Sequence, residues 1–290
     1  FHLAGIVPVA GPALDFEFPW HDSLQPIAKN YLAVERAVME CAYAGCETIW
    51  VVCHDDMQPL IKHRMGDYVQ DPLRQWNRWK KIPTDDQKLI PIFYVPIHPK
   101  DKDKRDCLGW SVLHGANSAH WVCRTLSKWV IPDRFYTAFP YGVYPPSVVQ
   151  KHRKQISSKT GFFLTYNNKS VINGEYLGFT FNADDFKACR KLVREQGTGI
   201  KVPRGSELSK ETLPIEKRWS ARTFTLDKVF ASVTIEDAYM TETPWYHNID
   251  NWDKLSSYLG SKEQTELNKP ASVFMNSSFK LQGISNDRTP

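Results

Sequence analysis

The chain has 290 residues, of which 42% are hydrophobic and 24% charged, and these proportions are ordinary for a globular protein. Its formal net charge is +5, but the densest basic stretch, residues 100–105, also contains acid. We expect a solvated loop there and no nucleic-acid partner, because interleaved carboxylates weaken any field that attracts phosphates. No run of 18 apolar residues occurs, so we also expect no membrane span.

The six cysteines form no Cys-x-x-Cys pair, and several lie in apolar stretches, where cysteine behaves as a small hydrophobe. A reducing compartment is the simplest interpretation. We therefore expect a cytoplasmic protein, or one built into a particle that assembles inside a cell. Aromatic residues make up 13% of the chain and include ten tryptophans. They suit either a well-filled core or a broad interface.

The first sixty residues predict a strand, a helix and a second strand. Residues 5–10 are a short apolar run, typical of a buried parallel strand. Residues 29–45 carry apolar side chains at helical spacing, and Gly45 suits the end of that helix. Residues 47–53 predict the second strand. This is a βαβ unit, whose crossover should be right-handed.

The remaining pattern continues as further strands and helices, with turn signals at Asn167-Asn168 and Asn173-Gly174. In chain order we expect a helix beginning within 57–65, a strand over 90–97, a helix in the second half of 109–130, a strand over 135–139, two strands within 161–182, a helix over 183–196, a loop over 197–219, a helix over 221–231, a strand over 233–240 and a helix over 249–260. The sequence predicts a three-layer α/β fold around a mixed, mostly parallel sheet. We expect one domain over 1–260 and a C-terminal arm or tail over 261–290.

Five stretches resemble, in order, those of the sugar-phosphate nucleotidyltransferases, also called nucleotide-sugar pyrophosphorylases. They are PVAG at 8–11, the segment 24–52, HGANSA at 114–119, the segment 173–186 and WYHNIDNWDKL at 245–255. The resemblance spans residues 5–260 and implies a Rossmann-like nucleotidyltransferase fold, related to that of GT-A glycosyltransferases. It implies a nucleotide or sugar-nucleotide ligand, held by Ala10 and Gly11, with Gly115 and Asn117 contacting the base.

The residues that carry the family's chemistry match much less well. In that chemistry a sugar 1-phosphate attacks a nucleoside triphosphate, so cations and a divalent metal supply most of the catalysis. In place of the family's Gly-x-Gly-Thr-Arg loop, this chain has Gly11-Pro12-Ala13-Leu14-Asp15, and Pro12 has no N–H to donate. The family's lysine position holds Asp22 or, after a shift of one residue, His21. A carboxylate there repels a triphosphate.

The family's metal-binding aspartates are also replaced. The first would lie near residues 140–142, where this chain has none. The second aligns with Asn248, whose amide brings no charge to hold Mg²⁺. Asp250 matches the second acid of that motif. If the chain is active, the resemblance implies Mg²⁺ held at Asn248 and Asp250.

Several of these residues also have simpler interpretations. His21 and Asp22 suit an exposed loop or a helix cap as well as a re-purposed acid pair. His54, Asp55 and Asp56 follow a strand at the end where α/β sheets bind ligands, but they also suit capping of the next helix. A helix starting near Asn117 or Ser118 competes with a base-binding role for Gly115 and Asn117.

Two functional hypotheses follow. In the first, the chain is a divergent nucleotidyltransferase-like protein without pyrophosphorylase activity, acting as a binding or structural module with a protein partner or as an oligomer. In the second, it is an active nucleotidyltransferase or glycosyltransferase with a rearranged site, in which His21, Asp22, Asp55, Asn248 and Asp250 supply the polar groups. The missing cations and metal carboxylates favour the first, and the Trp76–Trp79 segment and the C-terminal tail are where we expect partner contacts.

Overall fold

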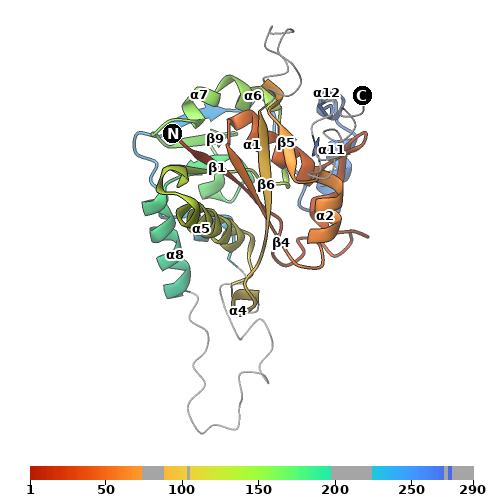
Figure 1. The fold of residues 1–290 in the computed structure, drawn as a ribbon. Coiled ribbons are helices and arrows are strands. Elements are labelled where there is room, and N and C mark those ends of the chain that lie inside the picture. Colours follow the sequence, from red (N-terminus) through yellow and green to blue (C-terminus); the bar gives the residue numbers. More distant parts are fainter. Residues whose placement is uncertain (74–87, 103–104, 197–223, 271–273, 276–290) are drawn as a thin grey trace, which may run out of the picture.

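The computed structural model describes residues 1–73, 88–102, 105–196, 224–270 and 274–275, and it is built around one mixed sheet (Figure 1). Its centre consists of four parallel strands in the order β7-β1-β4-β6. They are β1 (Leu3–Pro8), β4 (Thr48–Cys53), β6 (Leu89–Pro96) and β7 (Arg134–Thr137). β1, β4 and β7 are almost wholly buried, as is usual for parallel strands covered on both faces, whereas β6 is mostly half-buried.

Antiparallel strands extend the sheet at both edges. Beyond β7 lie β10 (Phe179–Phe181), β9 (Phe162–Thr165) and β11 (Tyr239–Glu242); beyond β6 lie β5 (Tyr68–Gln70) and β13 (Phe274–Met275). All of these added strands run antiparallel to their neighbours except β11, which runs parallel to β9. Two small pairs stand apart: β2 (Pro26–Ala28) with β3 (Tyr31–Leu32), and β8 (Gly142–Val143) with β12 (His247–Asn248). The prediction of a mixed, mostly parallel sheet is confirmed.

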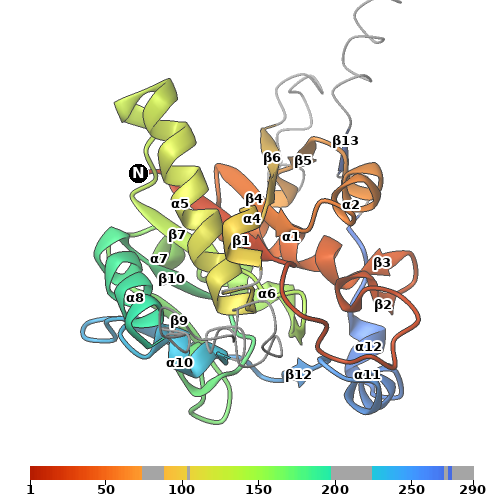
Figure 2. The same ribbon diagram turned by 90° about the horizontal axis from the view of Figure 1, so that it is seen from below.

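Helices cover both faces of the sheet, which makes three layers (Figures 1 and 2). On one face are α1 (Ala33–Ala44), α2 (Gln58–Met65), α6 (Pro146–Lys151), α7 (Arg153–Ile156) and α11 (Trp252–Leu259); on the other are α5 (Leu108–Leu126), α8 (Ala183–Gln196) and α10 (Leu226–Phe230). Successive side chains of β1 serve the two cores in turn: Leu3 and Val7 pack into the first, Ala4 and Ile6 into the second. This alternation follows from the period of a strand.

Short helices complete the fold: α4 (Pro99–Lys102), α12 (Glu263–Glu266) and 3₁₀ turns at Asp22–Leu24, Lys128–Val130 and Val171–Asn173. The described part of the C-terminal arm lies against the domain. Lys269 Nζ donates to Glu35 Oε1 at 2.8 Å, and β13 pairs with β5. In the described segments, no helix combines the length and apolar character needed to cross a membrane.

Most predicted elements lie where the sequence placed them. The helix expected over 29–45 is α1, and Gly45 ends it with a φ of 93°. Asn167 and Asn168 have φ of 50° and 60°, the turn geometry expected there. The loop over 197–219, the residues before Phe224 in the helix predicted over 221–231, and Trp76 and Trp79 lie outside the described residues.

Two boundaries were wrong. The helix predicted in the second half of 109–130 begins at Leu108, with Cys107 as its N-cap, so a helix start near Asn117 or Ser118 is excluded. Gly109, Ser111 and Gly115 lower helix propensity in the first half, but packing against the sheet overrides them. The strand predicted over 233–240 begins only at Tyr239, because the residues before it turn at Asp237, whose φ is 61°.

Candidate functional site

The switch-point cavity lies where the sheet reverses its order of strand addition. From β1 the chain adds β4 and β6 on one side and then β7 on the other. Open α/β sheets bind ligands beyond the carboxyl ends of strands at such a point. A cavity of about 210 Å³ is found there, lined by Val9, Ala10 and Gly11 after β1 and by Tyr141 after β7. Predicted ligand-binding residues Ala10 and Gly11 therefore meet at this cavity.

The lining of the switch-point cavity is uncharged. None of the described residues that form its wall is Lys, Arg, Asp or Glu. Carboxylates lie just outside it. The pKa of Tyr141 is raised by burial and then by the charge of Asp22. The pKa of Tyr176 is raised by burial and then by Asp250 and Asp22. Both tyrosines line the cavity, and the charges of described residues that raise their pKa values are negative.

Gly11 begins the loop after β1 and brings it close to helix α5. Its φ of 145° is a backbone conformation that favours glycine. A Cβ at this position would lie 3.4 Å from the Leu108 amide nitrogen and 3.7 Å from the Cys107 carbonyl carbon. Gly11 therefore lets the backbone of the loop come close to the beginning of α5.

Asp22 binds this loop from inside the protein. Its Oδ2 accepts the backbone N–H of Leu14 at 2.7 Å, and its side chain is only 3% exposed. Pro12, two residues earlier, has no N–H to offer an anion. A loop donor that would otherwise be available to a phosphate is thus satisfied by a carboxylate of the chain itself.

His21 caps the short helix that carries Asp22. Its Nδ1 accepts the Ser23 N–H at 3.3 Å and lies 2.8 Å from Ser23 Oγ and 3.6 Å from Asp22 Oδ1. Burial lowers the pKa of His21, which the charge of Asp22 only partly offsets. A neutral His21 suits the capping role, because its unprotonated nitrogen is the acceptor.

His54 forms an ion pair that the sequence did not indicate. Its Nε2 lies 3.2 Å from Oδ2 of Asp106, a residue that is 4% exposed, and the Gly11 amide nitrogen lies 3.4 Å from the same ring nitrogen. The hydrogen bond to Asp106 raises the pKa of His54 despite partial burial. The pair joins the end of β4 to the start of α5 beside the loop after β1.

Asp55 and Asp56, which follow His54, are exposed. The helix that comes next, α2, has Met57 as its N-cap with no side-chain capping bond. The interpretation of these aspartates as helix caps is therefore wrong.

Asn248 and Asp250 are close together, but they bind each other. Asn248 Nδ2 donates to Asp250 Oδ2 at 3.1 Å, and the Asp250 N–H donates to Asn248 Oδ1 at 2.9 Å. Lys254 Nζ donates to Asp250 Oδ1 at 2.7 Å. Three of the oxygens that Mg²⁺ would need are thus bound internally, one of them to an ammonium group. This arrangement does not fit Mg²⁺, which prefers several free carboxylate oxygens and water.

No other metal site replaces it in the described residues. They contain no group of three His, Cys, Asp or Glu side chains arranged to hold a metal ion.

Gly115 and Asn117 lie in the middle of α5 and do not line the switch-point cavity. A Cβ on Gly115 would lie 2.7 Å from Val52 Cγ2 and 2.9 Å from Ile6 Cγ2, so this glycine lets α5 pack tightly on β1 and β4. Asn117 lines a different cavity, on the outer side of α5. The structure therefore does not bring these two residues together with Ala10 and Gly11.

A buried polar network supports the sheet beneath the site. Glu40 of α1 accepts Tyr136 OH at 2.7 Å, accepts Tyr144 OH, and pairs with Arg36 at 2.7 Å. Arg36 also donates to the Phe139 carbonyl at 2.6 Å, at the chain segment that leads to Tyr141. All four side chains of the network are buried.

Comparison with known proteins identifies the fold. No protein-family model matches the chain, and no curated protein sequence matches it significantly. A Bacillus anthracis structure assigned as a glucose-1-phosphate thymidylyltransferase, in complex with sucrose, is 8% identical, with a TM-score of 0.54 over 92% of this chain and 97% of that one. UDP-glucose pyrophosphorylase complexed with UDP-glucose is 13% identical, with a TM-score of 0.52 over 91% of this chain and all of that one.

The apo form of UDP-glucose pyrophosphorylase is 12% identical, with a TM-score of 0.51 over 92% of this chain and all of that one. The chain therefore has the fold of the nucleotide-sugar pyrophosphorylases, as the resemblance implied. At these identities the likeness extends to the fold alone.

Proposed function

We propose that this chain is a nucleotidyltransferase-fold protein without pyrophosphorylase activity, which serves as a binding or structural module in a larger assembly. The observation that carries the proposal is the hydrogen bond from the Leu14 N–H to Asp22 Oδ2. Displacing this carboxylate with a phosphate would leave a buried, unpaired negative charge beside a second negative charge. Both effects are costly in a site of low dielectric constant.

The surroundings of the loop support the same conclusion. Triphosphate chemistry needs cations around the phosphates and a metal ion between them. The described wall of the switch-point cavity has no cation, and Lys254, which lies nearby in sequence to Asn248, is bound to Asp250. An uncharged part of a nucleotide sugar, the base or the sugar ring, matches this lining better than its phosphates do.

Exposed apolar side chains support a role in an assembly. Trp121 and Leu126, at the end of α5, are 54% and 73% exposed, and Val122 and Val130 beside them are also exposed. Apolar side chains gathered on a surface mark contact sites in many proteins. The Trp76–Trp79 segment lies outside the described residues. We take the surface around Trp121 and Leu126 as a candidate contact site for a protein partner or a second copy.

Pyrophosphate release tests the catalytic part of the proposal. The full chain is incubated with Mg²⁺, each nucleoside triphosphate and a panel of sugar 1-phosphates. We expect no release above that of a blank without protein. Release that disappears in the Asp250→Ala variant would show that the chain is an active nucleotidyltransferase with a rearranged site.

Sedimentation velocity over a range of protein concentrations tests the assembly part. We expect association that is weakened in the Trp121→Asp variant and retained in Lys187→Asp, a control with an exposed position on α8. A monomer at all concentrations that also binds Mg²⁺–UTP tightly would contradict a module role.

A further inference from the structure

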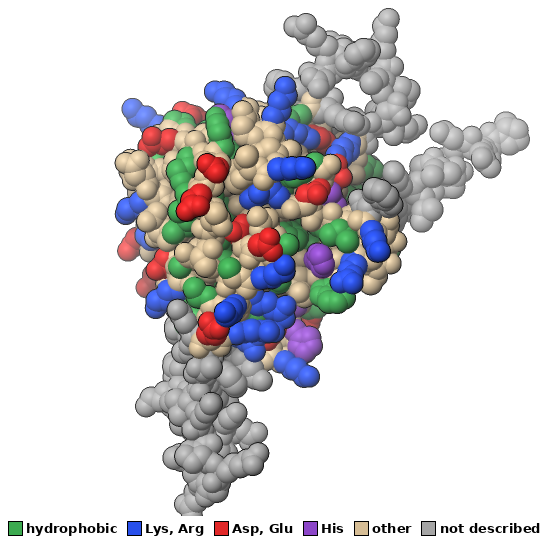
Figure 3. All heavy atoms as spheres, turned by 90° about the vertical axis from the view of Figure 1, so that its left-hand side faces the viewer, with side chains coloured by type: hydrophobic (Ala, Val, Ile, Leu, Met, Phe, Trp, Pro, Cys, Tyr) green, Lys and Arg blue, Asp and Glu red, His purple; other side chains and the backbone are tan. Residues whose placement is uncertain are grey.

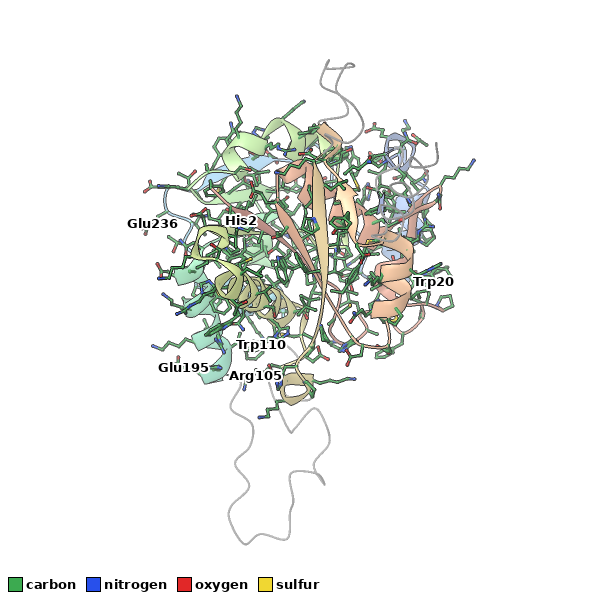
Figure 4. All side chains as sticks on the ribbon, viewed as in Figure 1. His2, Trp20, Arg105, Trp110, Glu195 and Glu236 are labelled. Carbon is green, nitrogen blue, oxygen red and sulfur yellow. The ribbon has the colours of Figure 1, made fainter. Side chains whose placement is uncertain are left out.

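The basic cavity lies on the other side of α5 from the sheet. It has a volume of about 420 Å³ and is formed by α4, the first half of α5 and α8. Figure 4 labels Arg105 and Trp110 at this position, and Figure 3 shows Lys and Arg side chains gathered low on this face of the molecule. It shares no lining residue with the switch-point cavity. Its volume is within the range of about 300–1,000 Å³ usual for small-molecule sites.

Positive charge predominates in the basic cavity. Lys100, Arg105, Arg190 and Arg194 line it, whereas Asp101 is the one acid among its described lining residues. Asp101 lies 3.8 Å from Arg105, a distance too long for a strong hydrogen bond. The pKa of Arg190 is lowered by partial burial and then by the charges of Arg194 and Arg105. Like charges that lie close together repel one another, so a bound anion would stabilise the cluster.

The wall of the cavity also holds an unsatisfied donor. Trp110 is 4% exposed, and its indole Nε1 has no hydrogen-bond partner in the described residues. The Arg105 guanidinium lies over the same ring, 5.0 Å from its centroid. A buried N–H without an acceptor destabilises the folded protein. A ligand oxygen that reached Nε1 would satisfy this donor.

The donor types favour phosphate over a simple carboxylate. Three arginines present planar forks of N–H groups, which match phosphate oxygens in pairs. Among the described lining residues, four cations against one carboxylate leave an excess of positive charge. A phosphate of two or more negative charges neutralises this excess better than a single carboxylate does. The Asn117 amide, on the turn of α5 beyond Trp110 and His114, can both donate to and accept from a neighbouring group.

We propose that the basic cavity binds a small phosphorylated ligand, with Arg105, Arg190 and Arg194 around the phosphate and Trp110 Nε1 as a further donor. The shared chemistry is the phosphate group, whether it belongs to a nucleotide, a sugar phosphate or pyrophosphate. The site is separate from the switch-point cavity and needs no metal ion. It therefore does not depend on the proposed function.

Calorimetric titration of the full chain tests the proposal. Pyrophosphate, UTP and glucose 1-phosphate are titrated separately, without Mg²⁺, at low and at physiological ionic strength. We expect saturable binding of at least one of them, weakened by salt. Tightest binding of UTP identifies a nucleotide site, tightest binding of glucose 1-phosphate a sugar-phosphate site, and equal binding of UTP and pyrophosphate a site for the phosphates alone. Absence of saturable binding for all three overturns the proposal.

Two variants locate the binding. Arg190→Gln/Arg194→Gln removes two cations that line the cavity, and we expect affinity to fall about tenfold or more. Lys187→Gln/Lys191→Gln makes the same charge change on α8 at exposed positions that do not line it, and we expect a fall of less than about threefold. Equal losses in the two variants would show non-specific attraction and contradict the proposal. Thermal unfolding verifies that both variants are folded.

Trp110→Phe tests the indole donor while keeping the ring beneath Arg105. We expect affinity to fall between about tenfold and about 150-fold, the range for one hydrogen bond to a charged group. Unchanged affinity would remove Trp110 Nε1 from the site.

Discussion

Asp22 and Leu14 are eight residues apart, and the carboxylate of one accepts the backbone N–H of the other at 2.7 Å. The bond closes the loop that follows β1 at the place where related folds approach a nucleotide. It gives the acid at position 22 a structural role, because the carboxylate accepts a backbone N–H of the loop. The arrangement keeps the loop closed, and under the proposed function it disfavours a polyanion there.

The stability of this loop depends on Asp22. Asp22→Ala leaves the half-buried Leu14 N–H without its acceptor, and we expect the free energy of unfolding to fall by about 1 kcal/mol. Asp22→Asn keeps an acceptor oxygen, so its loss should be smaller. Urea denaturation measures both. Asp184→Ala, at an exposed position on α8, is the control and should change stability by less than about 0.5 kcal/mol. Equal effects of Ala and Asn would argue against the hydrogen bond.

The His54–Asp106 pair makes stability depend on pH. Because Asp106 raises the pKa of His54 above 6.5 in the folded protein, the folded state binds the proton more tightly than the unfolded chain does. The stabilisation is therefore fully present below about pH 6.5 and is lost as pH rises through the raised folded pKa.

We expect the difference in unfolding free energy between the wild-type protein and His54→Gln to shrink as pH increases above about 6.5. Urea denaturation at a series of pH values measures it. His21 titrates in both proteins, but the charge of His54 is among the causes that lower the pKa of His21, so the His21→Gln/His54→Gln protein is compared with His21→Gln in the same way. A difference that grows with pH would contradict the pairing.

Glu40 holds the buried network beneath the site. Glu40→Ala leaves the Arg36 guanidinium buried without its carboxylate, and we expect a loss of about 3–5 kcal/mol in stability. Glu236→Ala removes the same charge from an exposed turn and should be neutral within about 0.5 kcal/mol. Chemical denaturation compares the two. A loss at Glu40 no larger than that at Glu236 would mean that the network contributes little.

A substitution at Gly115 tests whether this glycine serves in packing or in ligand binding. Gly115→Ala places a methyl group against Val52 and Ile6, and we expect overpacking to cost about 1–3 kcal/mol, more than the gain of about 1 kcal/mol in helix propensity. Gly260→Ala is the control, because its Cβ would meet only atoms at 3.7 Å. Thermal unfolding measures both. A Gly115→Ala protein of full stability would refute the packing account.

The fold could be predicted because its strands and helices carry strong local patterns. The apolar run of β1, the helical stripe of α1 and the glycine that ends α1 are each visible in a short stretch of sequence. The order of such stretches along the chain resembled that of a known family. The strand predicted from residue 233 failed because the turn at Asp237 carries no Gly or Pro signal. The early start of α5 was missed because its stability comes from burial against the sheet, which a local pattern does not contain.

The candidate site was less predictable, because its main contacts join distant residues. Asp106 lies 52 residues after His54, and nothing in the stretch around it distinguishes it from other charged loop residues. Asp22 was identified from the resemblance, but only the structure shows that its partner is a backbone amide. Arg190 and Arg194, at i and i+4 on one helix, offered a local signal for the basic cavity. Its other wall comes from α4 and α5, about 80 residues earlier in the chain.

The most direct test of the account follows the backbone amide of Leu14 by NMR while Mg²⁺–UTP is added. Asp22 already binds this amide, so we predict that the Leu14 and Gly11 signals do not move, even if UTP binds at the basic cavity. A saturable shift of both signals that is abolished in the Asp250→Ala variant would place a triphosphate at the loop and contradict the account.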